Sequence, residues 1–217
     1  GLHSELVGDE VRHLFSSGVI DNSMKSFLPG KCVATQAMGS RELYSFLHDN
    51  LHFDFRPSEY VNDPMTIARN DRLVSINSAL MVDLTGQVVA DSIQGLFRSG
   101  VGSMVDFVRG ASMSREGKPI IALPSTTTDE NGERISSIVA ELPAGAGVGC
   151  HRSDVHYIAT EFGVATLRGR TIQERVQELI QIAHPDFQDG LLEEARKHHL
   201  VPNFFKITPL MEKNRAS

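Results

Sequence analysis

The carboxylate of Glu5 is the first group in the chain that could do chemistry, and it lies in the stretch Gly1-Leu2-His3-Ser4-Glu5. A carboxylate is a weak nucleophile in water, but it can attack a thioester carbonyl when it is desolvated and aligned. An amphipathic segment that ends at Gly18 follows Glu5. Taken alone, Glu5 is more simply explained as a solvated carboxylate at the start of a helix, where the helix dipole favours negative charge.

Two other groups of residues have the composition of a conventional site. Cys150-His151 pairs a thiol with an imidazole, but adjacent residues in a strand point to opposite faces, which favours a buried, inert thiol. Asp154 and His156 could share a strand face as metal ligands, whereas Glu161 is out of phase with them. We therefore expect neither a thiol nucleophile nor a metal site.

An amide and a glycine-rich loop could supply hydrogen-bond donors. Asn62 stands in Tyr60-Val61-Asn62-Asp63-Pro64, where it could stabilise an oxyanion or act as an ordinary turn or helix-capping residue. The loop Ser99-Gly100-Val101-Gly102-Ser103 could bring its backbone close to a ligand, although most such glycine pairs only form turns. Neither pattern identifies a function without further context.

Long runs of residues supply that context. Together with the stretch around Glu5, they resemble the C-terminal half of the acetyl-CoA hydrolase / 4-hydroxybutyrate CoA-transferase family, the family I CoA-transferases, from Gly1 to about Phe205. The runs are Asp106-Phe107-Val108-Arg109-Gly110-Ala111, Lys118-Pro119-Ile120-Ile121-Ala122-Leu123-Pro124-Ser125-Thr126, Asp154-Val155-His156-Tyr157 and Ile182-Ala183-His184-Pro185-Asp186-Phe187.

The resemblance implies a function for Glu5. It matches the family's nucleophilic glutamate, which attacks an acyl-CoA, forms an acyl-glutamyl anhydride and then a glutamyl-CoA thioester, and passes the CoA to a carboxylic acid. The implied activity is CoA transfer between an acyl-CoA and a short-chain acid such as 4-hydroxybutyrate, butyrate or acetate. CoA is then a substrate, and no permanently bound cofactor is expected.

The resemblance also implies roles for other residues. Asn62 matches the amide that helps to stabilise the oxyanion, and Leu80 matches a CoA-contacting position, although an apolar strand residue could equally be plain core. Ser99, Gly100, Gly102 and Ser103 match the loop that approaches CoA through backbone N–H groups. The family usually has Gly-Val-Gly-Gly-Gln there, whereas this chain has Ser103-Met104 after Gly102, which changes the loop geometry and the substrate preference that we expect.

Apolar runs alternate with helical patterns, which predicts an α/β fold, an open sheet flanked by helices that resembles the NagB/RpiA-like CoA-transferase domain. The expected strands are residues 32–35, 73–84, 87–89, 119–123 and 155–160. The expected helices run from Val7 to Gly18, after the cap Ser40, after Asp63-Pro64, from the capping box Thr171/Glu174 to Ala183, and from Pro185. We also expect a loop from Gly95 to Gly102 and a polar tail from Glu212.

The composition excludes several classes of protein. The chain has 217 residues, 41% of them hydrophobic, with a net charge of −6 and acids and bases mixed throughout, which argues against a nucleic-acid partner. The longest apolar run is far below the roughly 18 residues that span a bilayer, so no membrane segment is expected. Two cysteines do not make a disulfide scaffold, and we expect a cytoplasmic location or another reducing, organellar one.

The resemblance implies that residues 1–217 are a C-terminal catalytic domain, with an N-terminal domain absent from this chain and CoA held between the two. The isolated piece is then expected to fold without transferring CoA, and the protein is expected to be a homo-oligomer. Two alternatives stay open. One is acetyl-CoA hydrolysis; the other is a non-catalytic CoA-binding or assembly module, favoured by the Ser103-Met104 departure and disfavoured by the presence of both Glu5 and Asn62.

Overall fold

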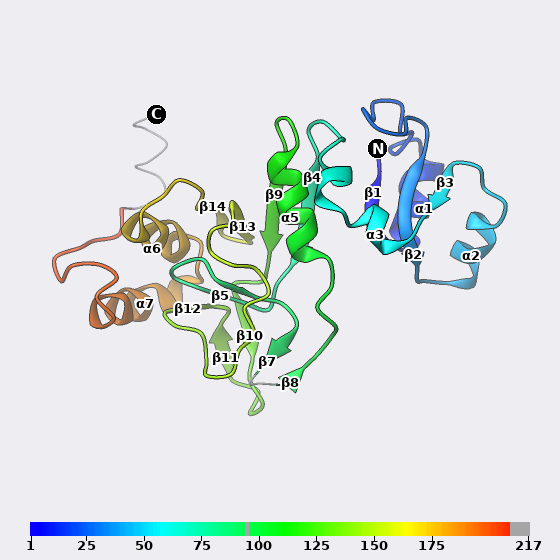
Figure 1. Cartoon of the computed structure of the whole chain (residues 1–217). Coiled ribbons are helices and arrows are strands. Elements are labelled where there is room, and N and C mark those ends of the chain that lie inside the picture. The colour runs from blue at the N-terminus through cyan, green and yellow to red at the C-terminus, as the bar shows by residue number, and fades with distance from the viewer. Residues whose placement is uncertain (94–95, 209–217) are drawn as a thin grey trace. The chain divides into compact units, whose positions relative to one another are not determined.

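A parallel three-stranded sheet lies at the centre of the first of two units into which the chain divides (Figure 1). The computed structural model describes residues 1–93 and 96–208, and this first unit comprises Gly1–Val74 and Asp106–Lys118. Its strands follow the order β1 (His3–Val7), β2 (Cys32–Ala37) and β3 (Phe53–Phe55). Its helices are α1 (Asp9–Ser16), α2 (Arg41–Leu47), α3 (Ser58–Val61), α4 (Pro64–Ile67) and the part of α5 (Met104–Met113) that begins at Asp106.

Helices cover both faces of this sheet. Val33 of β2 is buried with Ile67 and Phe107, which belong to α4 and α5. The next residue, Ala34, is buried with Leu43 of α2. Because successive strand residues point to opposite faces, the two clusters lie on opposite sides of the sheet. Parallel sheets are normally buried on both faces. This packing holds in place β1, the strand that carries the polar side chain of Glu5.

The strand β1 corrects our expectation for the start of the chain. The helical pattern included Val7 and Phe15, whereas the structure ends a strand at Val7 and begins α1 at Asp9. The helix does stop at the expected place, before Gly18, whose φ is +76°. Pairing with β2 decides the conformation of residues 3–7, because so short a segment carries no clear period of its own. Glu5 therefore lies within a strand, and its interpretation as a helix-start carboxylate is wrong.

The second unit comprises Ser75–Val105 and the chain from Pro119 onward, and it holds two larger sheets (Figure 1). Four strands follow the order β14 (Gly163–Thr166), β13 (Tyr157–Thr160), β9 (Lys118–Ala122) and β4 (Val74–Ser78). Three follow the order β12 (Ile138–Val139), β5 (Met81–Asp83) and β6 (Val88–Val89). Two hairpins pair β7 (Ser92–Ile93) with β8 (Leu96–Phe97), and β10 (Thr126–Thr128) with β11 (Arg134–Ser136).

The run of residues 73–84 forms two strands and not the single strand that its apolar pattern predicts. The N–H of Ala79 donates to the carbonyl of Ala122 in β9, and the N–H of the next residue, Leu80, donates to the carbonyl of Val89 in β6. Adjacent residues thus join different sheets, and the strand breaks between them. Thr85 and Gly86 lie between the paired strands β5 and β6, and Gly86 has a φ of +97°.

The last two helices largely agree with the sequence. Helix α6 (Ile172–Gln181) begins with the predicted capping box, in which Thr171 and Glu174 exchange hydrogen bonds. Helix α7 (Pro185–Lys197) is capped by His184, whose side chain accepts from the Asp186 N–H. Ile172 is 37% exposed because it opens the helix at the edge of the packed surface. The α/β class is confirmed, whereas Gly95 and the tail from Glu212 lie outside the described residues.

Candidate active site

The fold places Glu5 and Asn62 next to each other, although the sequence separates them by 57 residues. Glu5 is the central residue of β1, and Asn62 follows the last residue of α3. The Asn62 Nδ2 donates to Oε1 of Glu5 at 3.4 Å, a long contact of the kind common in catalytic groups that have no substrate bound. Both side chains are partly buried. The structure thus brings together the two residues that we predicted to be catalytic.

The neighbouring Asp63, and not Asn62, caps the helix that follows. The Asp63 carboxylate accepts from the N–H of Met65 at 3.3 Å and of Thr66 at 2.9 Å, which closes the first turn of α4. Asn62 itself stands at the C-terminal end of α3, with its Oδ1 buried and unpartnered among the residues that the structure describes. Asp63 thus forms the N-cap of α4, whereas Asn62 occupies the C-cap position of α3 and its side-chain amide donates to Glu5.

A third acidic residue, Asp106, belongs to the electrostatic surroundings of Glu5. It lies in the first turn of α5. Burial raises the pKa of the Asp106 carboxyl; the Arg109 guanidinium lowers it, while the negative charges of Glu5 and Asp63 raise it, and the net shift is upward. The sequence analysis quoted this residue in a motif without giving it a role. Only its place at the start of a helix that packs near β1 could have drawn attention to it.

The predicted CoA-contacting residues belong to the second unit. Leu80 is half-buried at the break between β4 and β5. Ser99 and Gly100 are exposed just after β8, and the N–H of Ser99 lies within hydrogen-bonding distance of the Asp91 carbonyl, at 3.4 Å. Gly102 has a φ of +65°, which a residue with a Cβ rarely adopts.

Ser103 is the residue directly before α5, and it is buried. Serine is favoured at that position because its hydroxyl can satisfy a free N–H of the first turn. This preference gives a physical reason for a serine where the family usually has glycine.

The structure also shows the surroundings of Cys150 and of the possible metal ligands Asp154, His156 and Glu161. Cys150 is fully buried and forms an isolated bridge with Val88. Asp154 and His156 both precede β13, so they do not share a strand face, and Glu161 accepts hydrogen bonds from Ser125. Within residues 1–93 and 96–208, no three His, Cys, Asp or Glu side chains lie close enough to hold a metal ion.

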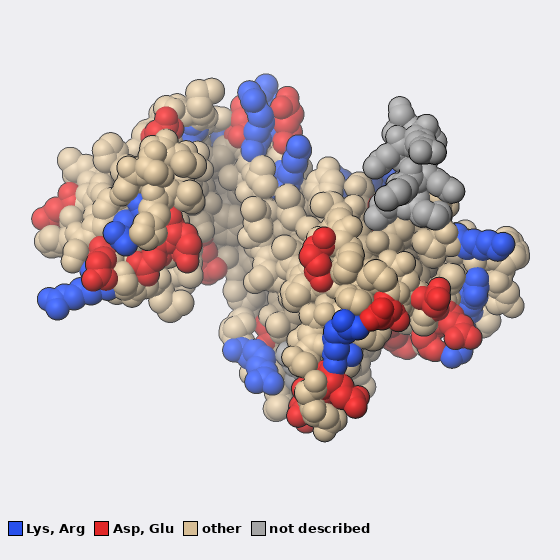
Figure 2. Space-filling model, turned by 180° about the vertical axis from the view of Figure 1, so that it is seen from behind, with Lys and Arg blue, Asp and Glu red and all other residues tan. Residues whose placement is uncertain are grey.

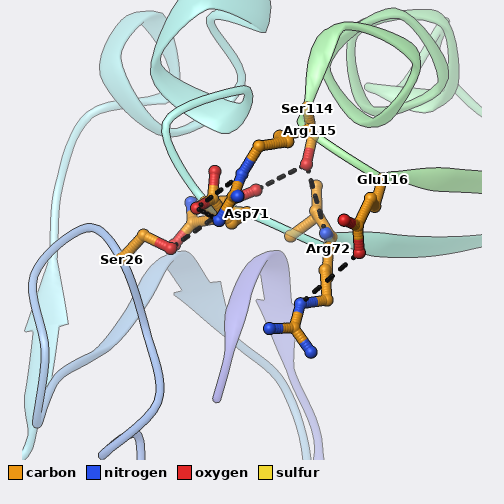
Figure 3. A network of polar contacts seen from close by, with 8 residues as sticks. Ser26, Asp71, Arg72, Ser114, Arg115 and Glu116 are labelled. Carbon is orange, nitrogen blue, oxygen red and sulfur yellow. Dashed lines mark hydrogen bonds and ion pairs between the residues drawn. The ribbon is translucent and has the colours of Figure 1, made fainter.

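A hollow in the first unit, which Glu5 does not line, lies beside a network of polar contacts; Figure 3 shows this network. The hollow has a volume of about 520 Å³, and its walls include Leu2, Lys25 and Arg115. In the network, Arg115 donates to Asp71 at 2.6 Å, and the Asp71 N–H donates to Ser26 at 3.1 Å. These contacts tie the loop after α4 to the end of α5.

The surface carries both signs of charge. Figure 2 shows acidic and basic side chains intermingled on the face in view. Each helix in the described part of the chain is too short or too polar to serve as a membrane span.

Comparison with known proteins connects this geometry to a family. Residues 39–195 match the family described as the acetyl-CoA hydrolase/transferase C-terminal domain. The 4-hydroxybutyrate coenzyme A transferase of Clostridium kluyveri is 46% identical over 197 residues, which cover 91% of this chain and 45% of that protein. The succinyl-CoA:cyclohexane-1-carboxylate CoA transferase of Geobacter metallireducens is 47% identical and is likewise covered to 45%.

Solved structures agree with these matches. RipA from Yersinia pestis superposes with a TM-score of 0.85 at 42% identity, over 93% of this chain and 44% of that one. A 4-hydroxybutyrate CoA-transferase from Porphyromonas gingivalis gives a TM-score of 0.76 at 39% identity, over 91% of this chain and 45% of that one. The chain thus spans about half the length of these relatives. It belongs to the acetyl-CoA hydrolase/transferase C-terminal domain family.

Proposed function

We propose that this chain is the C-terminal catalytic part of an acyl-CoA:carboxylate CoA-transferase, with Glu5 as the nucleophile. The observation that carries the proposal is the contact between Glu5 and Asn62, which sets a hydrogen-bond donor beside a carboxylate. The names of the relatives at 46% and 47% identity, all CoA-transferases, support it. Because these relatives are about twice as long, the activity is proposed for the whole protein.

The reaction has two half-reactions: CoA passes from the acyl-CoA to Glu5, and then from Glu5 to the acceptor acid. The Glu5 carboxylate attacks the acyl-CoA carbonyl, and the C–S bond breaks to give an acyl-glutamyl anhydride and the CoA thiolate. The thiolate then attacks the glutamyl carbonyl, which releases the first carboxylate and leaves CoA on Glu5 as a thioester. An incoming carboxylate reverses these steps, takes up the CoA and restores the Glu5 carboxylate.

Asn62 is placed to assist the attack of the CoA thiolate on the glutamyl carbonyl. Its Nδ2 is aimed at the Glu5 carboxylate, the position at which an oxyanion develops when the glutamyl carbonyl is attacked. A fixed donor of this kind is worth about 3–4 kcal/mol in the transition state. Negative charge on Glu5 also contributes to the raised pKa of Asp106, and this contribution disappears when Glu5 is acylated.

We assign CoA contacts to Leu80 and to the loop of Ser99, Gly100, Gly102 and Ser103. The exposure of Ser99, Gly100 and Gly102 and the positive φ of Gly102 suit a close approach to a ligand. The acid substrates are short-chain carboxylates such as 4-hydroxybutyrate, butyrate or acetate. The relatives named butyrate:acetyl-CoA coenzyme A-transferase, from Syntrophomonas wolfei, and 4-hydroxybutyrate coenzyme A transferase support this class.

A single experiment tests the chemistry. The full-length protein is incubated with acyl-CoA, and its mass and its proteolytic peptides are measured. We expect a CoA adduct on the peptide that contains Glu5, and loss of the adduct when a carboxylic acid is added together with formation of the new acyl-CoA.

The outcomes separate the three candidate functions. Release of the adduct by water alone would identify a hydrolase. This alternative is considered because a relative from Saccharomyces cerevisiae, 28% identical, is named acetyl-CoA hydrolase. CoA binding without an adduct or turnover would identify a binding module. An adduct on another residue would overturn the assignment of Glu5.

A further inference from the structure

His3 connects the strand that carries Glu5 to the helix that precedes Asn62. The His3 Nε2 lies 2.8 Å from the carbonyl oxygen of Val61. His3 and Glu5 are two residues apart in β1 and therefore project from the same face of the strand. Val61 is the last residue of α3, and Asn62 follows it. The contacts from His3 to Val61 and from Asn62 to Glu5 thus run side by side between the same two elements.

The surroundings of His3 fix its hydrogen-bonding role. The side chain is buried, and its ring packs against Phe107 of α5 with 6.1 Å between ring centroids. A carbonyl oxygen only accepts, so Nε2 must carry the proton. Nδ1 is buried with no hydrogen-bond partner in the described part of the chain, and burial lowers the pKa of His3. The imidazole is therefore a neutral donor held in one tautomer.

The position of β1 in its sheet explains why such a tether is needed. In the described sheet β1 is an edge strand that pairs only with β2. The N–H of Leu2 donates to Asn22 at 2.7 Å, and Lys25 donates to the Leu2 carbonyl at 2.9 Å. These two contacts fix the start of the strand, but neither involves α3. The hydrogen bond from His3 to the Val61 carbonyl adds a direct, buried link between β1 and the end of α3.

We propose that His3 is a positioning residue for CoA transfer, whose hydrogen bond to the Val61 carbonyl holds Glu5 and Asn62 at their working separation. The inference rests on the proposed function of Glu5. A displacement of about 1 Å between reacting groups can cost roughly a hundredfold in rate. Loss of this hydrogen bond therefore acts on kcat, while acyl-CoA binding elsewhere in the site is unaffected.

The test compares His3→Gln with His3→Asn in the full-length protein. Glutamine can place an amide N–H near the position of Nε2, whereas the shorter asparagine reaches only the position of Nδ1. We expect His3→Gln to keep kcat within about threefold of the wild type and His3→Asn to lose at least tenfold. KM for acyl-CoA should stay the same in both, whereas the melting temperature of His3→Asn should fall because the buried Val61 carbonyl loses its donor. His3→Phe, which keeps the ring but removes the donor, should resemble His3→Asn.

The kinetic results for the His3 variants test the positioning role directly. Equal kcat values for the glutamine and asparagine variants, whether high or low, would overturn the proposal, as would a full-rate His3→Phe enzyme. A parallel change in kcat and KM would also overturn it, because a positioning role acts on turnover alone. An inactive wild type that forms no adduct on Glu5 would instead refute the proposed function itself.

Discussion

The Asn62 amide reaches the Glu5 carboxylate because the end of α3 lies against an edge strand. Val61, just before Asn62, is fully buried in a cluster with Val33 of β2, so the end of the helix is anchored to the sheet. The contact between Asn62 and Glu5 is thus a product of core packing. Glu5 or Asn62 can therefore be substituted without disturbing the packing of Val61, which brings the two positions together.

Glu5→Gln should abolish CoA transfer and leave folding almost unchanged. The amide has the shape of the carboxylate and can keep contact with Asn62, but it cannot form the anhydride. Transfer rate, adduct formation and thermal unfolding are the measurements, with deamidation back to glutamate excluded by peptide mass. Activity above a few per cent of the wild-type rate would show that Glu5 is not the nucleophile.

Asn62→Ala should lower kcat by roughly two powers of ten, equivalent to about 3 kcal/mol, with a smaller effect on KM. Its donor acts on charge that develops in the transition state, so binding is affected less. Asn70→Ala is the matched control, since Asn70 is a buried asparagine of the same unit whose amide donates to the Ile67 carbonyl. The control should lose stability and retain kcat. An Asn62→Ala enzyme with that same pattern would refute the oxyanion role.

Local signals predicted the caps and several strands. The capping box of Thr171 and Glu174, the Ser40 cap of α2 and the Asp63-Pro64 start of α4 all depend on residues within a few positions of one another, and all are confirmed. The strand at Glu5 was missed because its conformation depends on pairing with β2, about thirty residues away in the sequence.

The composition of the site could be predicted only in part. Glu5 and Asn62 were identified by resemblance, and no periodicity places them together. His3 and Asp106 were missed because their relevance depends on Val61 and on burial near Glu5, which are tertiary features. A histidine two residues before the nucleophile in a strand would have been the usable signal, once that segment was known to be a strand.

Gly102→Ala should weaken acyl-CoA binding, with KM raised several-fold, and should cost about 1 kcal/mol of stability. Gly102 has a φ of +65° and no atom within 4 Å of a built Cβ, so the cost is conformational and not steric. Gly132→Ala is the matched control, because Gly132 also has open space and a positive φ of +81° but lies outside the proposed CoA-binding loop. Equal KM values for the two variants would argue against a role for the Gly102 geometry.

The stability of the wild type should fall as the pH rises through the range in which Asp106 titrates. In Asp106→Asn this fall should be absent. The pKa of Asp106 is raised in the folded state, so between its ordinary value of 3.8 and the folded value the folded protein binds more protons. Stability therefore falls as the pH rises through this window. Melting temperatures of both proteins from pH 3.5 to 7 test this; a constant difference between them would contradict it.

Lys25→Met should abolish a stabilisation that develops in the wild type at alkaline pH. Lys25 donates to the carbonyls of Leu2 and Lys31, and burial lowers its pKa from 10.5 to about 8. Between these values the unfolded chain binds more protons than the folded one, so wild-type stability relative to the variant rises with pH. The slope is at most about 1.4 kcal/mol per pH unit, and solvent screening reduces it because the amine is only partly buried.

Denaturant unfolding of both proteins between pH 7.5 and 10 measures this slope, because groups common to the two proteins cancel in the difference. The variant should also loosen the start of β1, since the Leu2 carbonyl loses one of its two donors and keeps only the N–H of Val33. Hydrogen exchange of the β1 amides should therefore quicken in Lys25→Met at neutral pH. A stability difference that does not change with pH would show that the Lys25 ammonium is not desolvated by the fold.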